Sequence, residues 1–114
     1  MPQPSAYDIE CLQKAIAVIE RDHAVRHTVR ELAIVAGMGI TKFQSAFKMY
    51  AGYNVFEFVR EQRMKKAQLL VIENYHSIKT IAQLCGYRYS SHFNTAFKKR
   101  FGISAKRIRS QIKI

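Results

Sequence analysis

Apolar residues recur every three or four positions along most of the chain, a spacing typical of helices rather than strands. The only two prolines, Pro2 and Pro4, lie at the start and interrupt none of these stripes. The first stripe follows Ser5, a residue type that caps helices, and consists of Ile9, Leu12, Ile16 and Ile19. The pattern predicts a first helix that begins after Ser5 and ends near His23.

A second, shorter helix is predicted after Thr28. Thr28 and Glu31 have the three-residue spacing of a capping box, and apolar residues follow at positions 32, 33, 35 and 36. Gly37 comes next, and glycine is the residue type that most often ends helices. The segment is therefore expected to form a short helix with a glycine stop.

This segment begins an internal repeat. A shift of 49 positions aligns residues 28–37 with residues 77–86 and places Ala33 on Ala82 and Gly37 on Gly86. After one extra residue in the second copy, a shift of 50 continues the match: Phe43 on Phe93, Phe47 on Phe97, Lys48 on Lys98 and Gly52 on Gly102. Each copy has a cap, a short helix, a glycine turn, a second helix and a closing glycine.

This order of elements predicts two helix-turn-helix units. Two helices that cross over a tight turn need a small residue at the crossing and a residue that tolerates positive φ four positions later. The repeated alanine and glycine meet both needs. Because aromatic residues at helical spacing usually pack together, the phenylalanines of the second helices are expected in the core, not stacked on bases: Phe43, Phe47, Phe93, Phe97 and Phe101.

A long helix is predicted between the two units. Asn54 and Glu57 have capping-box spacing, and no helix breaker follows until Asn74. About 19 residues at about 1.5 Å each would span about 28 Å. The first core should receive Val55, Phe58 and Val59, and the second Met64, Ala67, Leu70 and Val71. We therefore expect an all-α chain of about seven helices: a first subunit over 5–53, a connecting helix over 54–73, and a second subunit over 74–114 with a last helix capped by Ser104.

The charge of the chain is strongly one-sided. Its 114 residues include 19 Lys and Arg against 8 Asp and Glu, which gives a net charge of +11. No acid follows Glu73, whereas nine bases do. Such a surface attracts polyanions, so nucleic acid is the leading partner and an anionic membrane the second.

The second copy of the repeat carries the most specific motif, Ser77–Tyr87 followed by Ser91–Gly102. With these residues the chain resembles the double helix-turn-helix DNA-binding domain of the AraC/XylS transcription regulators, from about Asp8 to Arg109. The resemblance implies one homeodomain-like DNA-binding domain over residues 1–114. It also implies sequence-specific binding of double-stranded DNA by a bacterial transcription regulator, as an activator.

In a helix-turn-helix, the second helix enters the major groove. Because the phenylalanines define its buried face, the opposite face is expected to read bases: Ile40, Thr41, Gln44 and Ser45 in the first unit, and Ser90, Ser91, Asn94 and Thr95 in the second. Gln44 and Asn94 are equivalent in the repeat, and either amide can pair with adenine N6 and N7. With a connecting helix close to the roughly 34 Å of one duplex turn, both reading helices would enter successive major grooves.

Phosphate contacts are expected from cationic side chains near these helices: Lys48, Arg63, Lys79, Arg88, Lys98, Lys99 and Arg100. The helix starts at Thr28 and Ser77 would add backbone amides. For each of these residues, and for Gln44 and Asn94, the alternative is a solvated polar side chain without a ligand.

Two other functions fit the sequence. One is nonspecific binding of RNA or DNA, for which the charge alone would suffice. The other is a helical module that contacts RNA polymerase, a role compatible with DNA binding. A small-molecule effector is expected only if a sensing domain accompanies this one. A membrane is not among the partners expected from the resemblance, and no run of about 18 apolar residues occurs that could span one.

Catalysis is not expected, because the sequence has no glycine-rich phosphate loop, nucleophile elbow or paired carboxylates. His23 and His27 are four positions apart but have no third ligand, which favours a surface or capping role over a metal site. Cys11 and Cys85 are interpreted as small buried residues in a reducing cytoplasm. The sequence thus predicts no cofactor and no metal, and a cytoplasmic, nucleoid-associated location.

Overall fold

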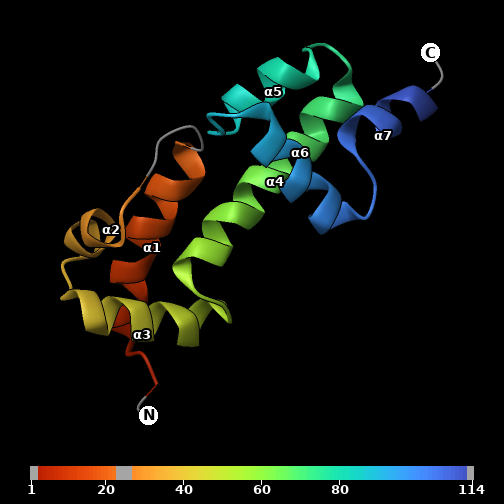
Figure 1. Ribbon diagram of the computed structural model, residues 1–114. Helices are drawn as coiled ribbons and strands as arrows, with labels where there is room; N and C mark the ends of the chain where they lie inside the picture. The colour runs from red at the N-terminus through yellow and green to blue at the C-terminus, as the bar shows by residue number, and fades with distance from the viewer. Residues whose placement is uncertain (1–2, 23–26, 113–114) are drawn as a thin grey trace. The chain divides into compact units, whose positions relative to one another are not determined.

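The computed structural model describes residues 3–22 and 27–112. Over these residues the chain forms seven helices and no strand (Figure 1), so the predicted all-α fold is confirmed. The helices are α1 (Ala6–Arg21), α2 (Val29–Ala36), α3 (Ile40–Ala51), α4 (Val55–Glu73), α5 (Ile78–Leu84), α6 (Ser90–Phe101) and α7 (Ala105–Gln111). His23, where the first helix was expected to end, lies outside the described residues, and α1 ends at Arg21.

The chain divides into two compact units, unit 1 (Met1–Glu61) and unit 2 (Gln62–Ile114), and the division falls within α4. Each unit has its own hydrophobic core, to which its part of α4 contributes. Among the described helices, none is long and apolar enough to cross a membrane.

The predicted helix caps are present. At α1, the Ser5 hydroxyl accepts a hydrogen bond from the Asp8 amide at 3.0 Å, and the Asp8 carboxylate accepts one from the Ser5 amide at 3.1 Å. Asn54 and Glu57 make the same reciprocal pair before α4. Side-chain oxygens of three further predicted caps accept the amide of the residue three positions on: Thr28, Ser77 and Ser104. Capping satisfies amides that a helix start leaves without a partner, which is why these local signals define the helix starts.

The turn between the first two helices of each repeat has the same backbone geometry in both copies. Gly37 and Gly86 have positive φ, 70° and 89°. The next residue donates its amide to the repeated alanine, Met38 to Ala33 and Tyr87 to Ala82, each at 2.9 Å. Both alanines are buried. The internal repeat is therefore a structural repeat, with a glycine wherever left-handed backbone is required.

In unit 1, α1, α2 and α3 pack around one core, and α3 lies across α1 (Figure 1). Phe43 and Phe47 of α3 are completely buried, with ring centroids 5.7 Å apart. From the predicted stripe of α1, Leu12 and Ile19 are buried, whereas Ile9 is only half-buried. Cys11 and Ala15 complete the buried face of α1 together with the partly buried Ile16.

Unit 2 repeats this arrangement around α5 and α6. Phe93 and Phe97 are completely buried 5.7 Å apart, and Phe101 packs on Phe97 at 4.6 Å. The predicted assignment of the apolar residues of α4 to the two cores is confirmed. The unit 1 core receives Val55, Phe58 and Val59. The unit 2 core receives Met64, Ala67, Leu70 and Val71. The expected burial is confirmed for Phe43, Phe47, Phe93 and Phe97, whereas Phe101 is only partly buried against the unit 2 core.

Arg109 of α7 ties the end of α4 to the rest of unit 2. Its guanidinium donates to the carbonyl oxygens of Leu70 and Val71, each at 3.3 Å, and to that of His76. The last carbonyls of a helix lack partners within the helix, and they carry the negative end of its dipole. Arg109 therefore donates to the Leu70 carbonyl at the α4 terminus and adds a second donor to the Val71 carbonyl, which also accepts the Asn74 amide at 3.2 Å.

Replacing Arg109 with Met is expected to destabilise unit 2 by about 1.5–3 kcal/mol, because hydrogen bonds from a charged donor are lost at a half-buried site. Urea denaturation followed by circular dichroism measures the loss. Arg107→Met, on the exposed side of the same helix, is the matched control and should change the unfolding free energy by less than about 0.5 kcal/mol. A loss below about 0.5 kcal/mol for Arg109→Met would show that Arg109 does not stabilise unit 2.

Candidate nucleic-acid interface

The first candidate reading surface is the solvent-facing side of α3. Phe43, Ala46 and Phe47 occupy the buried side of this helix. The predicted reading residues lie opposite: Ile40, Thr41 and Gln44 are exposed, and Ser45 is half-buried. Two turns of helix thus present one long amide, two hydroxyls and one apolar side chain, a set that can donate to and accept from base edges.

The second candidate surface is the equivalent side of α6. Asn94, Ser91 and Thr95 are exposed, and Ser90 is half-buried. The Thr95 hydroxyl donates to the Ser91 carbonyl at 3.0 Å, so this donor is already engaged within the helix and only its acceptor capacity faces outward. Gln44 and Asn94 are the longest exposed uncharged polar side chains in their respective predicted reading sets.

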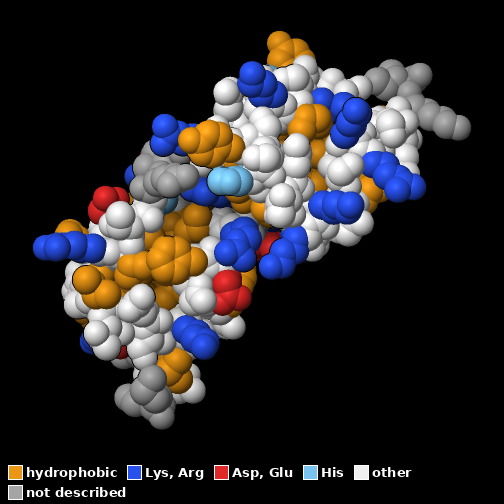
Figure 2. All heavy atoms as spheres, in the orientation of Figure 1, with side chains coloured by type: hydrophobic (Ala, Val, Ile, Leu, Met, Phe, Trp, Pro, Cys, Tyr) orange, Lys and Arg blue, Asp and Glu red, His pale blue; other side chains and the backbone are white. Residues whose placement is uncertain are grey.

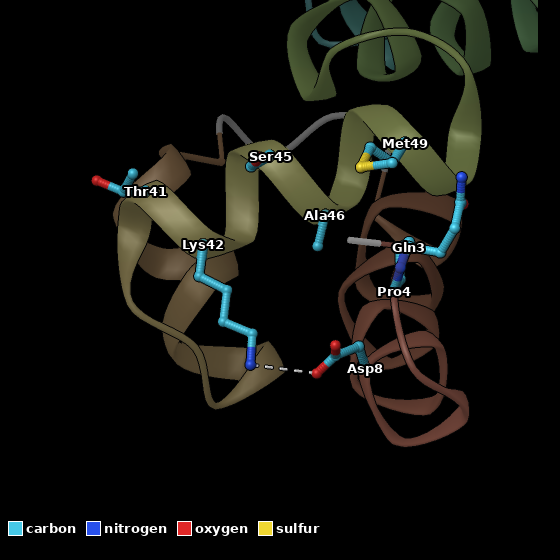
Figure 3. A pocket seen from close by; sticks show the side chains of 8 residues that line it. All are labelled: Gln3, Pro4, Asp8, Thr41, Lys42, Ser45, Ala46 and Met49. Atoms are coloured by element: carbon cyan, nitrogen blue, oxygen red, sulfur yellow. Dashed lines mark ion pairs between the residues drawn. The ribbon is translucent and has the colours of Figure 1, made fainter. Parts of the chain in front are cut away.

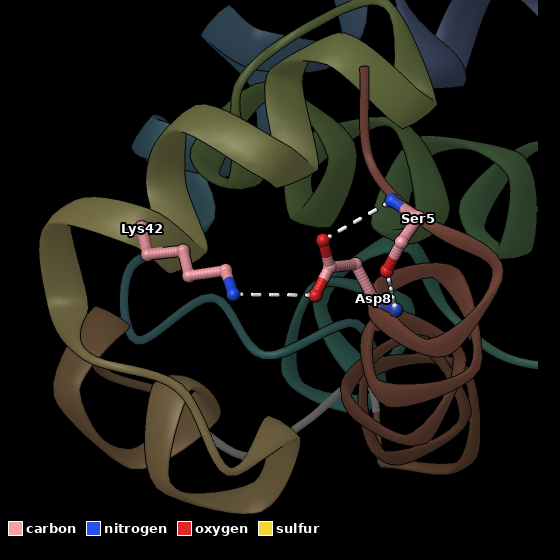
Figure 4. A network of polar contacts seen from close by, with 3 residues as sticks. All are labelled: Ser5, Asp8 and Lys42. Carbon is pink, nitrogen blue, oxygen red and sulfur yellow. Dashed lines mark hydrogen bonds and ion pairs between the residues drawn. The ribbon is translucent and has the colours of Figure 1, made fainter. Parts of the chain in front are cut away.

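A polar contact that the sequence did not predict connects α3 to α1. The Lys42 ammonium lies 3.3 Å from the Asp8 carboxylate, which also accepts the Ser5 amide (Figure 4). The Ser5 backbone N–H and, to a smaller extent, the Lys42 ammonium lower the pKa of Asp8. Asp8 therefore stays ionised at neutral pH and offsets the charge of Lys42 in the first turn of α3.

A shallow open hollow of about 550 Å³ lies beside this contact (Figure 3). Its walls combine one side of α3 with the segment before α1 and the first turn of α1: Gln3, Pro4, Asp8, Thr41, Lys42, Ser45, Ala46 and Met49. In Figure 3 the Lys42 side chain reaches toward Asp8, whereas Thr41 points away from it. Ser45, which is half-buried, forms part of this wall.

Six of the seven predicted phosphate-binding cations are exposed: Lys48, Lys79, Arg88, Lys98, Lys99 and Arg100. Two of them lie over aromatic rings, Arg88 over Tyr89 at 5.5 Å and Arg100 over Phe101 at 4.9 Å. In the view of Figure 2, Lys and Arg side chains are spread over α6 and α7. These cationic groups lie on the surface, where a polyanion can approach them.

The other predicted phosphate contacts have structural roles as well. Arg63 is half-buried, with its guanidinium 5.6 Å from the centre of the Tyr87 ring, so part of this side chain packs inside unit 2. The hydroxyls of Thr28 and Ser77 accept amides within their own helix starts. The Ser77 hydroxyl also donates to the Thr80 hydroxyl at 2.9 Å, so the Thr28 hydroxyl and the neighbouring backbone amides are the groups left to donate to a phosphate.

The cysteines and histidines form no site among the described residues. Cys11 and Cys85 are buried, as predicted, and burial raises the pKa of the Cys85 thiol to about 11, so it stays uncharged at neutral pH. His27 lies 3.2 Å from the Asp22 carbonyl, whereas His23 is outside the described residues. Over 3–22 and 27–112, no group of three or more His, Cys, Asp or Glu could hold a metal.

Two short helices joined by a glycine turn, the second exposing a polar face, define a helix-turn-helix protein, and here the motif occurs twice. A family model described as a helix-turn-helix domain matches residues 32–111. The chain belongs to this family, in its AraC-type branch. The family and the fold are those of DNA-binding transcription regulators, which are not enzymes.

Individual relatives agree with this assignment. The probable transcriptional regulator LumQ of Photobacterium leiognathi is 32% identical over 89 residues, which are 78% of this chain and 36% of LumQ. An AraC-type regulator structure from Chromobacterium violaceum has a TM-score of 0.82 at 23% identity, covering 94% of this chain and 96% of that one. The DNA-binding domain of AdpA, solved in complex with a target DNA, also has a TM-score of 0.82 at 23% identity, covering 96% and 92%.

The chain spans about a third of LumQ and between 24% and 36% of other curated relatives that it matches, which include a xylose operon regulatory protein and the activators AggR and RhaR. The family match covers α3 to α7 completely and most of α2, and so includes nearly all of the double helix-turn-helix.

Proposed function

We propose that this chain binds double-stranded DNA at specific sequences as the DNA-binding part of a transcription activator. In this proposal α3 and α6 each enter a major groove, and the grooves are successive. One observation carries the proposal: the same exposed position of the two equivalent helices holds an amide side chain, Gln44 in α3 and Asn94 in α6. Each amide can make two hydrogen bonds to an adenine edge.

Around these amides, smaller side chains would contact neighbouring bases. The proposed set is Ile40, Thr41 and Ser45 for unit 1, and Ser90, Ser91 and Thr95 for unit 2. The exposed cations beside each helix would bind phosphates and so position the helices without reading sequence. Arg63 would contribute less than the others, because its guanidinium packs against Tyr87.

RNA polymerase is the second partner that we propose, since an activator must affect transcription from its DNA site. Any small-molecule effector would act through a sensing domain elsewhere in the protein. The proposed location is the cytoplasm, on the nucleoid, where the DNA is.

Replacing Gln44 or Asn94 with Ala should weaken binding to a preferred duplex by about 1–3 kcal/mol, because bidentate base contacts are lost. Binding to random duplex should change little. Fluorescence anisotropy titrations of both duplexes measure the two losses. Gln68→Ala, at an exposed amide of α4 outside the proposed interface, is the control and should leave both affinities unchanged. Equal losses on the preferred and random duplexes would show that these amides do not read bases.

Competition distinguishes specific DNA binding from a general affinity for polyanions. A labelled preferred duplex should stay bound in the presence of excess random duplex or RNA, and an unlabelled copy of itself should displace it. Equal displacement by all three competitors would contradict the proposed function and favour a nonspecific nucleic-acid binder.

A further inference from the structure

We infer that the two units hold DNA unequally: unit 2 binds any duplex through its charge, whereas unit 1 engages only where the sequence matches. This inference rests on the proposed DNA binding and divides that function between the units. Its basis is the division of charge. Unit 1 has seven Lys and Arg against seven Asp and Glu, a net charge of zero, whereas unit 2 has twelve against one, a net charge of +11.

The same inequality appears on the two reading helices. The last turns of α6 carry Lys98, Lys99 and Arg100, all exposed. At the three equivalent positions, α3 has Lys48 followed by Met49 and Tyr50. The other cation of α3, Lys42, forms its ion pair with Asp8 within unit 1. Lys48 is therefore the remaining cation of α3, against three on α6.

The starts of the first helices differ in the same direction. Glu31 is exposed in the first turn of α2, beside the amides that Thr28 caps, and the equivalent residue of α5 is Thr80. A carboxylate at a helix start is favoured by the helix dipole but repels a phosphate that would bind there. The start of α2 in unit 1 therefore has a negative charge that repels a phosphate, whereas the equivalent residue at the start of α5 in unit 2 is uncharged.

Nonspecific DNA affinity comes from phosphate neutralisation and the release of counterions. Unit 2 has the charge to supply this affinity on any sequence, because its only acid is Glu73. Unit 1 is neutral, so its association must depend on base contacts such as that of Gln44. On random DNA the chain is bound through unit 2, and on a matching site unit 1 adds its contacts and most of the discrimination.

Lys48→Gln and Lys98→Gln test this division, because the same substitution is made at equivalent exposed positions of α3 and α6. Affinities of the full chain for a random duplex and for a duplex selected by the chain are measured from 50 to 200 mM salt. On random duplex, Lys98→Gln should make the negative slope of log affinity against log salt shallower by about 0.9 and reduce the affinity at 50 mM on the order of tenfold. Lys48→Gln should change it less than about twofold.

On the selected duplex, both substitutions should weaken binding, since both units are then engaged. Thermal unfolding of each variant confirms that the fold is unchanged. Equal effects of the two substitutions on random duplex, including no effect of either, would overturn the inference even if a selected duplex is strongly preferred. If no duplex is preferred over random DNA, the proposed function itself fails, so the two failures are distinguishable.

Discussion

The affinity of the chain for its DNA site is expected to fall by about 10³-fold or more when salt is raised from 50 to 200 mM. Each phosphate neutralised lowers the slope of log affinity against log salt by about 0.9, so six contacts give a loss of this size over a fourfold change. Unit 2 has more than six exposed cations to supply them, including Lys79, Arg88, Lys98 and Lys99. Anisotropy titrations at several salt concentrations measure the slope.

Salt also affects folding, so the thermal unfolding midpoint of the free chain over the same range is the control. An unchanged midpoint assigns the loss of affinity to the DNA contacts. A binding affinity that hardly changes with salt would contradict the prediction that exposed cations of unit 2 neutralise DNA phosphates.

Phe93→Ala is expected to reduce the unfolding free energy of unit 2 by about 3–5 kcal/mol. The ring is completely buried against Tyr87 and Phe97, with centroids 5.6 and 5.7 Å away, and its removal leaves a cavity under α6. Urea denaturation followed by circular dichroism should show a transition at lower denaturant. DNA binding should be lost in parallel as α6 loses its support.

Phe56→Ala provides the matched control for this prediction. Phe56 lies on α4 with 57% of its surface exposed, so its removal creates little cavity. The expected cost is below about 1 kcal/mol. Similar losses of unfolding free energy from Phe56→Ala and Phe93→Ala would show that Phe93 of α6 is wrongly assigned to the unit 2 core.

The local features of the fold could be predicted because their causes are local. A cap needs only a hydroxyl or amide and the backbone amide three residues on, which is why Ser5, Thr28 and Ser104 mark helix starts correctly. The repeat then predicted the buried rings of both units, since equivalent positions in a repeat face the same way. Leu12 and Ile19 were also predicted as core, although burial of Ala15 shows that the α1 stripe is rotated slightly from the one expected.

Contacts between residues distant in sequence could not be predicted in this way. Asp8 and Lys42 are 34 positions apart, and Arg109 reaches carbonyls 33 to 39 positions away. Nothing in the helical pattern distinguishes these charges from solvated ones, because a pattern gives the face of a helix but not its neighbours. The prediction of Arg63 as a phosphate contact did not include its packing against the Tyr87 ring, for the same reason.

The candidate site was predictable to the level of a helix face and no further. Helical spacing places Gln44 and Asn94 opposite the phenylalanines, and both are exposed. It does not show that Ser45 forms part of a hollow wall or that the Thr95 hydroxyl is bonded to the Ser91 carbonyl. Base identity depends on the docked geometry of both helices, which helical spacing alone does not define.

Selection of bound duplexes from a random pool tests the central claim most directly, since the protein itself chooses the sequences that it binds. If two polar helix faces read DNA together, the enriched sequences should contain two short conserved boxes whose centres are about 10 base pairs, or one duplex turn, apart. Adenines within the boxes should be lost from the preference when Gln44 or Asn94 is replaced. Enrichment of no sequence at all would contradict the account.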